Sequence, residues 1–202
     1  DGCWEVQIPG KTDFAYMPFD ALQIFNQALG LTGDDVPAYD SAEALYTAFL
    51  DRLRDTVEAL YRSRVQEAYV CADGVWQASG AVPPTSVVSL FEDGCIENAA
   101  PYFALGPVYT VRSPHIGGAP DVANSLYAIE RLVFEEKKAT LPELIAILRN
   151  NWEGSEPLRL YVKNRYTYYG NDADGADGWH TRLLNDFAAL VYGCSRSNSS
   201  PA

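Results

Sequence analysis

The sequence is short of basic residues and of long apolar runs, and each shortage excludes a class of function. Lys and Arg number 15 against 27 Asp and Glu, which gives a formal net charge of -12. Such a chain repels nucleic-acid backbones and anionic membranes, so we expect neither as a partner. No window approaches the roughly 18 apolar residues that span a bilayer, and no basic and apolar leader opens the chain. These absences predict a soluble, cytoplasmic protein.

The cysteines and histidines lack the spacings that mark metal or redox sites. The four cysteines lie far apart, so no zinc site or two-cysteine redox motif is encoded locally: Cys3, Cys71, Cys95 and Cys194. Reduced cysteines are favoured, with two disulfides in a secreted protein as the alternative. His115 and His180 have no ligand-type neighbours, and we interpret both as surface or packing residues. The acidic run at 172–177 fails the EF-hand pattern and is interpreted as caps for a helix.

What the sequence does contain predicts a globular, helix-rich α/β fold. Residues of hydrophobic type make up 48% of the chain and aromatic residues 12%, which is ample for a buried core. Apolar spacing, caps and turn residues predict most elements, including a helix closed by Gly30 and a helix capped by Asp40 and Glu43. The expected helices are 19–30, 40–69, 120–138, 140–152, 156–164 and 177–192; the expected strands are 85–91, buried, and 106–113; the expected loops are 1–13 and 72–84.

One short phrase occurs twice. Asp-Gly-Cys, a bulky apolar residue and Glu appear at 1–5 as DGCWE and again at 93–97 as DGCIE. The first copy continues into VQIPGKT, and the whole string resembles the catalytic cysteine loop of glycyl radical enzymes, the pyruvate formate-lyase-like group. Residues 120–154 resemble the helix pair that comes next in that family, and RYTYYGNDADGAD at 165–177 resembles its Tyr-Gly-Asn-Asp loop. The order also agrees, so the resemblance covers essentially the whole chain.

The resemblance implies a fold and a domain organisation. Glycyl radical enzymes are ten-stranded α/β barrels of two half-barrels, and this chain corresponds to a helix-rich part of the second half. We expect residues 1–194 to be a partial pyruvate formate-lyase-like domain, with 1–13 as its cysteine loop and 195–202 as a polar tail. The N-terminal half-barrel and the glycyl radical domain are absent from the sequence. The chain therefore looks like a piece of something longer, and alone it should be inactive.

The resemblance also implies an activity for Cys3 and Glu5. The family breaks a bond in a small organic substrate, as a lyase, dehydratase or decarboxylase, through a cysteine thiyl radical. Cys3 is the residue that takes a hydrogen atom, and Glu5 is the general base. In an extended loop their Cα atoms lie roughly 6.5 Å apart on one side, so the carboxylate raises the pKa of the thiol and keeps it protonated. No cofactor is bound by this part. A glycyl radical outside the chain is installed by an activating enzyme that uses S-adenosylmethionine and an iron-sulfur cluster, and the full-length enzyme is expected to be a homodimer.

Differences between this sequence and the family pattern limit the range of possible substrates. Members that eliminate from diols, glycerol and choline have Gly-Trp-His-Asp after the Pro-Gly-Lys-Thr and an acidic residue, whereas this chain has Phe14, Ala15, Tyr16 and Met17. The formate-type enzyme has adjacent cysteines, which argues against formate C-acyltransferase activity here, although it stays an alternative within the family. Phe14 and Tyr16, with Phe19, are candidates to line an aromatic substrate pocket, against the alternative that they are ordinary core.

For the second copy of the phrase a structural role is favoured. A cysteine after a buried strand is usually a small core residue, and Glu97 is suited to capping the segment after Cys95. The remaining alternative for the whole chain is a non-catalytic, truncated relative that acts as a structural or binding module.

Overall fold

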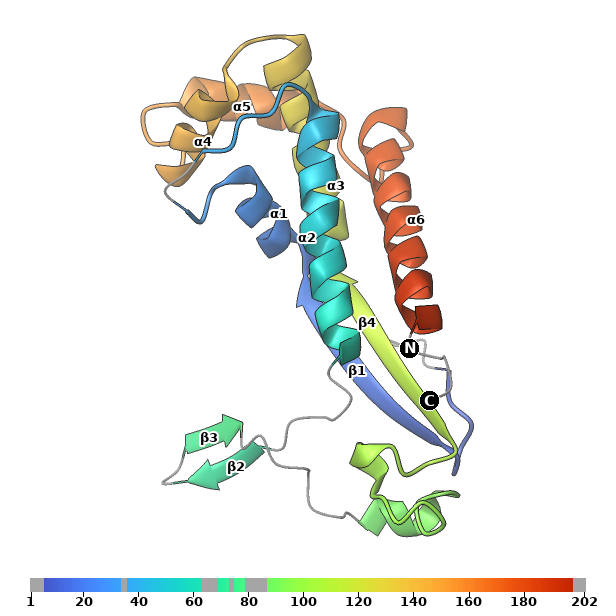
Figure 1. Ribbon diagram of the computed structural model, residues 1–202. Coiled ribbons are helices and arrows are strands. Elements are labelled where there is room, and N and C mark those ends of the chain that lie inside the picture. Colours follow the sequence, from blue (N-terminus) through green and yellow to red (C-terminus); the bar gives the residue numbers. More distant parts are fainter. Residues whose placement is uncertain (1–5, 34–35, 63–68, 73–74, 79–86, 198–202) are drawn as a thin grey trace. The chain divides into compact units, whose positions relative to one another are not determined.

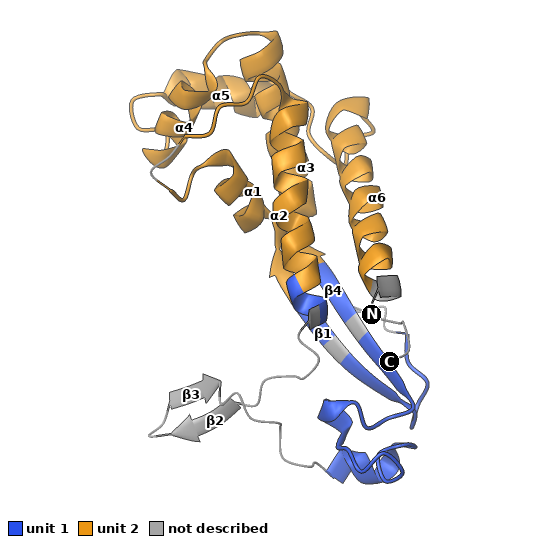
Figure 2. Cartoon of the chain, in the orientation of Figure 1, with its two compact units in different colours: residues 1–17, 59–115 blue, residues 18–58, 116–202 orange. Residues whose placement is uncertain are grey.

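The computed structural model describes residues 6–33, 36–62, 69–72, 75–78 and 87–197, which belong to two compact units (Figures 1 and 2). The strand unit comprises residues 1–17 and 59–115, and the helical unit comprises residues 18–58 and 116–202. The described elements, in chain order, are β1 Thr12–Asp20, α1 Ala21–Leu29, α2 Ala42–Arg62, β2 Tyr69–Ala72, β3 Val75–Ala78, the 3-10 helices η1 Val87–Phe91 and η2 Tyr102–Ala104, β4 Tyr109–Gly117, α3 Ala119–Ile129, the π-helix η3 Glu130–Glu135, α4 Leu141–Arg149, α5 Glu156–Arg165 and α6 Asp174–Ser197.

Strands β1 and β4 pair with each other, although about ninety residues of sequence separate them. They run in the same direction, as the arrows in Figure 1 show. Near the start of the pair the N–H of Tyr109 donates to the carbonyl oxygen of Lys11 at 2.9 Å. At its end, a Cβ on Gly117 would lie 3.2 Å from the carbonyl oxygen of Phe19. The strand predicted at 106–113 is thus confirmed as β4, which begins and ends a few residues later.

Helix α1 forms where its end signals predicted it. The carboxylate of Asp20 accepts a hydrogen bond from the N–H of Leu22 at 2.9 Å, which caps the first turn. Gly30 ends the helix with φ 84°, a left-handed conformation that suits glycine. The buried face includes Phe25, whose ring lies edge-on to Phe49 of α2 with centroids 5.8 Å apart. This contact belongs to the core of the helical unit.

The start of α2 corrects the predicted cap. The hydroxyl of Ser41, not Asp40, accepts a hydrogen bond from the N–H of Ala44 at 3.2 Å. Ser41 stands directly before the first helical residue, where a short hydroxyl side chain reaches the third amide. The Glu43 carboxylate instead binds Arg182 of α6. The predicted helix is also too long, because α2 ends at Arg62 and Tyr69 begins β2.

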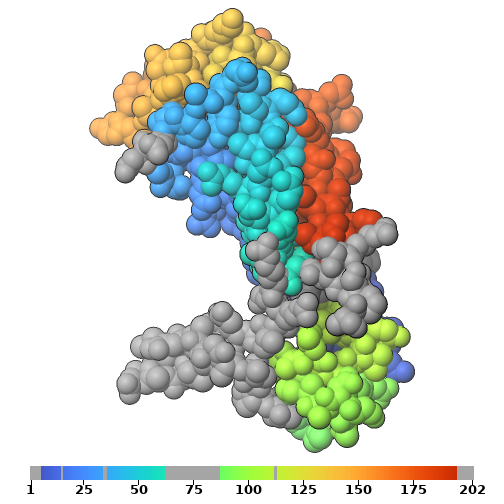
Figure 3. Space-filling model, viewed as in Figure 1, coloured from blue at the N-terminus to red at the C-terminus, as the bar shows by residue number. Residues whose placement is uncertain are grey.

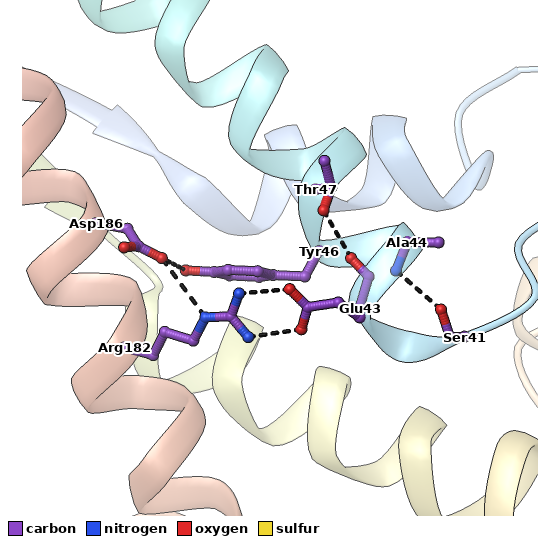
Figure 4. Close-up of polar contacts among 7 residues, drawn as sticks. All are labelled: Ser41, Glu43, Ala44, Tyr46, Thr47, Arg182 and Asp186. Atoms are coloured by element: carbon purple, nitrogen blue, oxygen red, sulfur yellow. Dashed lines mark hydrogen bonds and ion pairs between the residues drawn. The ribbon is translucent and has the colours of Figure 1, made fainter.

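Glu43 takes part in a cluster that joins α2 to α6 (Figure 4). In the space-filling view the atoms of these two helices lie against each other (Figure 3). The guanidinium of Arg182 donates two hydrogen bonds to the Glu43 carboxylate, one of them 2.6 Å long. It also lies over the ring of Tyr46, 4.5 Å from the centroid. The Tyr46 hydroxyl donates to Asp186 at 2.7 Å. Burial, followed by this bond to Asp186, raises the pKa of Tyr46, so the hydroxyl stays protonated and the cluster holds the two helices together.

The C-terminal helices largely follow the sequence prediction. Thr140 and Glu143 form the expected capping box at the start of α4, with the N–H of Thr140 donating to the Glu143 carboxylate at 2.8 Å. Helix α5 is also confirmed. The helix predicted over 120–138 is α3 followed by the wider turns of η3. The last helix begins earlier than predicted, at Asp174, and continues to Ser197, into the segment predicted as a polar tail.

Two predictions for the middle of the chain are wrong. Residues 87–91 of the buried strand expected at 85–91 form the short 3-10 helix η1, in which Ser89 is buried and Phe91 is 76% exposed. A strand needs a partner for its backbone groups, and in the described ranges the only sheets are β1–β4 and β2–β3. The loop expected at 72–84 contains β3, which pairs antiparallel with β2 so that Tyr69 lies opposite Ala78. The distribution of apolar residues alone did not distinguish a strand from a 3-10 helix or a loop in these segments.

Candidate functional site

The two predicted catalytic residues, Cys3 and Glu5, lie outside the described residues. The structure does describe the segment after them, a turn at residues 8–12 that leads into β1. Gly10 has φ 73°, and the N–H of Lys11 donates to the carbonyl oxygen of Ile8 at 3.0 Å. The N–H of Ile8 donates to the hydroxyl of Thr12 at 2.9 Å, and Thr12 is buried. These bonds define the geometry of the Pro-Gly-Lys-Thr turn.

The second Asp-Gly-Cys phrase supports this turn. The N–H of Asp93 donates to the carbonyl oxygen of Gly10 at 2.7 Å, and the Lys11 ammonium lies 3.6 Å from the Asp93 carboxylate. Asp93 is itself held by the N–H of Val108, which donates to its carbonyl oxygen at 3.1 Å. The second copy of the repeated phrase therefore fixes the Pro-Gly-Lys-Thr turn, which follows the first copy in the sequence.

Cys95 and Glu97 stabilise the segment that contains Asp93, the first by packing and the second by a hydrogen bond. Cys95 is buried, as predicted, and burial together with the charge of Glu92 raises the pKa of its thiol. A Cβ on Gly106 would lie 2.8 Å from the Cys95 sulfur, so glycine is required for this close approach. The carboxylate of Glu97 accepts a hydrogen bond from the N–H of Gly94 at 3.1 Å. A protonated, buried thiol is chemically inert, which fits a packing role.

Phe14 and Tyr16 lie on one face of β1, because side chains of a strand alternate between its two faces. The N–H of Phe14 donates to the hydroxyl of Tyr102 at 3.3 Å, which anchors the strand to η2. Phe14 is half-buried, whereas Tyr16 is 52% exposed. Phe19 has the opposite parity, and its ring lies 5.8 Å from that of Phe187 in α6. The pair Phe14 and Tyr16 thus shares a surface, while Phe19 packs against a helix.

His115 lies next to Tyr16 on the surface that Phe14 and Tyr16 share. Nothing in the sequence indicated this contact. Its ring lies on Tyr16, with centroids 4.0 Å apart and planes inclined at 50°. Its Nδ1 is 2.9 Å from the carbonyl oxygen of Ser113. Residue 115 was interpreted as surface or packing because it has no ligand-type neighbour in sequence. Only the pairing of β4 with β1 brings the imidazole to Tyr16.

Asp177, one of the acidic residues predicted to cap the last helix, lies in the first turn of α6 and binds N–H groups of the loop before that helix. The carboxylate of Asp177 accepts hydrogen bonds from the N–H of Gly170 at 2.8 Å and the N–H of Ala173 at 3.0 Å. The ring of His180 lies on Tyr169, with centroids 4.0 Å apart. Within the described residues, no group of three or more His, Cys, Asp or Glu side chains is arranged to hold a metal ion.

The helical unit contains an apolar cavity of about 360 Å³ between α1, α3, α4 and α5. Its walls are largely aliphatic and aromatic, with Phe25, Leu132 and Trp152 among them. Asn124 is one of its few polar residues, and its side-chain oxygen already accepts a hydrogen bond from the N–H of Tyr169 at 2.8 Å. The cavity brings together no acid and base pair, so it offers packing space rather than reactive groups.

Comparison with known proteins gives a family match over nearly the entire chain. The model of the family described as pyruvate formate lyase-like matches residues 1–201. Trans-4-hydroxy-L-proline dehydratase of Clostridioides difficile is 28% identical over 170 residues, which is 84% of this chain and 20% of that protein. Isethionate sulfite-lyase of Nitratidesulfovibrio vulgaris is 47% identical over 73 residues, 36% of this chain and 8% of that protein. The chain thus spans only a small part of the length of these relatives.

A solved structure shows the same fold. The glycerol-bound form of the B12-independent glycerol dehydratase of Clostridium butyricum superposes with a TM-score of 0.70 at 22% identity, covering 94% of this chain and 25% of that one. The expected fold class, a helix-rich part of a glycyl radical enzyme α/β barrel, is confirmed by this match. Among the described helices, none has the length and apolar character needed to cross a membrane.

Proposed function

The chain belongs to the pyruvate formate lyase-like family, and we propose that it is the catalytic-cysteine part of a glycyl radical lyase acting on a small organic substrate. The observation that carries this proposal is the match over residues 1–201, which includes the Cys-x-Glu phrase at 3–5 and the turn after it. The hydrogen bond from Asp93 to Gly10 supports this proposal, because the chain that follows a reactive loop must be held in place to position the reacting groups. The names of the relatives, a dehydratase and a sulfite-lyase, favour elimination over acyl transfer.

Cys3 and Glu5 divide the chemistry between an atom transfer and a proton transfer. In the whole protein an activating enzyme with S-adenosylmethionine and an iron-sulfur cluster would install a glycyl radical. That radical would take the hydrogen atom of the Cys3 thiol, which leaves a sulfur radical on Cys3, and glycine would return this hydrogen atom after turnover. The Cys3 sulfur radical then takes a hydrogen atom from a substrate carbon that carries a hydroxyl or an amine, and the Glu5 carboxylate takes the proton of that group. A carbonyl or an imine forms as the bond at the neighbouring carbon breaks, and the leaving group departs with the electron pair. The Cys3 thiol finally returns the hydrogen atom to the carbon radical, so atoms and electrons balance.

The exposed face of β1 supports a substrate surface on the strand that follows the cysteine segment in the sequence. We assign Phe14 and Tyr16 to it, because they share one face and Tyr16 presents an aromatic ring to solvent. The complete enzyme is proposed to be a cytoplasmic homodimer that needs its activating enzyme as a partner.

The test uses the complete gene product that carries this sequence, activated without oxygen. Spin resonance measures the glycyl radical, and product analysis measures turnover of trans-4-hydroxy-L-proline, isethionate and pyruvate. We expect a radical signal, elimination from one of the two hydroxylated compounds, and no turnover of pyruvate. A protein that never gains a radical would instead be the non-catalytic relative.

The site assignment is tested with two cysteine variants. Cys3→Ser should abolish turnover, because a hydroxyl gives up a hydrogen atom far less readily than a thiol does. The matched control is Cys95→Ala, which removes the buried sulfur of the second phrase and should retain turnover. Turnover by Cys3→Ser at the native rate would contradict the assignment.

A further inference from the structure

His115 is held in one orientation by two contacts from different strands. The Tyr16 ring of β1 covers one side of the imidazole, with centroids 4.0 Å apart. On β4 itself, Nδ1 lies 2.9 Å from the carbonyl oxygen of Ser113. A ring that is tilted against a neighbouring ring and has one anchored nitrogen cannot rotate freely, so its second nitrogen points in a fixed direction. Such preorganisation is typical of residues that bind a ligand.

The anchoring bond determines which nitrogen carries the proton. A carbonyl oxygen accepts hydrogen bonds and never donates them, so Nδ1 must be the protonated nitrogen. In the neutral imidazole Nε2 then carries the lone pair and accepts a hydrogen bond. In the described part of the chain, no residue provides a hydrogen-bond partner for Nε2 of His115. Nε2 is thus the acceptor that this ring can offer to a ligand.

His115 lies on β4, which pairs with the strand that follows the Pro-Gly-Lys-Thr turn. Tyr16 stands on the strand that leaves the Pro-Gly-Lys-Thr turn, and that turn is held in place by Asp93. A substrate of the proposed lyase carries a hydroxyl group that donates a hydrogen bond. The geometry points to His115 as a substrate-binding residue that accepts a hydrogen bond at Nε2 from a hydroxyl group of the substrate, with Tyr16 holding the ring in place. This inference rests on the proposed function.

Three variants of the activated, complete protein test the inference. His115→Phe keeps a ring against Tyr16 and removes both nitrogens, whereas His115→Gln retains a polar acceptor at about the position of Nε2. The matched control is His180→Phe, because His180 lies on Tyr169 with the same centroid separation of 4.0 Å, at a place with no assigned role. The substrate is whichever compound of the panel the native protein converts. Radical content, KM and kcat are measured for each variant.

We expect His115→Phe to raise KM at least tenfold, about the effect of one lost hydrogen bond to a bound group, with unchanged radical content. His115→Gln should recover most of the loss, and His180→Phe should match the native protein. A purely structural role predicts no recovery by Gln, so that outcome would overturn the inference, as would native KM in His115→Phe. Absence of radical and turnover in the native protein would instead refute the proposed function itself.

Discussion

The backbone N–H of Asp93 donates a 2.7 Å hydrogen bond to the carbonyl oxygen of Gly10. Asp93 begins the second copy of the repeated phrase, and Gly10 lies in the Pro-Gly-Lys-Thr turn, which follows the first copy in the sequence. A main-chain bond of this kind does not depend on the side chain at either position. The side chains of Lys11 and Asp93 add an ion pair of 3.6 Å, with both groups about half exposed or more.

The Lys11–Asp93 ion pair should contribute little to the free energy of unfolding. Asp93→Asn removes the charge and keeps the backbone bond, and exposed pairs contribute about 0–1 kcal/mol. We therefore expect a change in the free energy of unfolding of less than about 1 kcal/mol, measured by denaturant titration at low and high salt. A larger, salt-dependent loss would mean that the side chains, and not the main chain, hold the turn.

A side chain at Gly106 should destabilise the fold, because the backbone there lies close to Cys95. In Gly106→Ala the new methyl group would lie 2.8 Å from the Cys95 sulfur and against the carbonyl oxygen of Ala100. Overpacking of this kind destabilises by about 1–3 kcal/mol, which thermal unfolding would report as a lower Tm. Gly33→Ala is the control, since a Cβ there meets nothing within 4 Å. Equal Tm values for the two variants would refute the predicted crowding.

The Arg182–Glu43 pair should make stability depend on acid pH. Hydrogen bonding from Arg182 lowers the pKa of the Glu43 carboxyl, the largest of its causes. Since the folded pKa lies below the unfolded value of about 4.3, the stabilisation is complete above about pH 4.3 and is lost as pH falls through the folded pKa. Glu43→Gln should therefore flatten this part of the curve of unfolding free energy against pH.

The same pair depends on a planar guanidinium. Arg182→Lys keeps the charge but loses the two-point contact with Glu43 and the stacking over Tyr46, so it should lower the Tm. Arg159→Lys is the control, because Arg159 pairs with Glu156 within α5 and joins no separate helices. If both variants lower the Tm equally, the cluster does not hold α2 to α6.

The capping box of α4 gives a local test. Thr140→Ala should cost about 1 kcal/mol of unfolding free energy, because the N–H of Glu143 loses its side-chain acceptor. Thr56→Ala is the matched control in the middle of α2, where the hydroxyl only donates back to the carbonyl oxygen of Arg52. That change should be neutral or slightly stabilising, since alanine favours helices. A neutral Thr140→Ala would show that the cap contributes nothing.

The helices were predictable because their determinants are local. Apolar spacing and end signals such as Gly30 and the Thr140 capping box act over a few residues, so the sequence alone shows where α1, α4 and α5 begin or end. Caps with competing acceptors were less predictable. Ser41 and Asp40 both suit the start of α2, and the partner of Glu43 is an arginine distant in sequence.

The strands depended on partners that no local pattern specifies. The apolar run at 85–91 has the composition of a buried strand, yet among the described residues it has no strand beside it and forms η1 instead. Residues 75–78, with flanking glycine signals, pair with β2 and form a strand. Pairing of backbone groups decides such cases, and pairing is a property of the folded chain.

By itself, the sequence determined the family resemblance, the helix-rich composition and the cysteine phrase with its glutamate, because each is expressed in neighbouring residues. Only the tertiary structure decided that Asp93 supports the turn at Gly10 and that His115 lies against Tyr16. Both relationships join segments about eighty to one hundred residues apart. The parallel pairing of β1 with β4 and the backbone bonds around it bring these segments together, and no spacing within either segment records them.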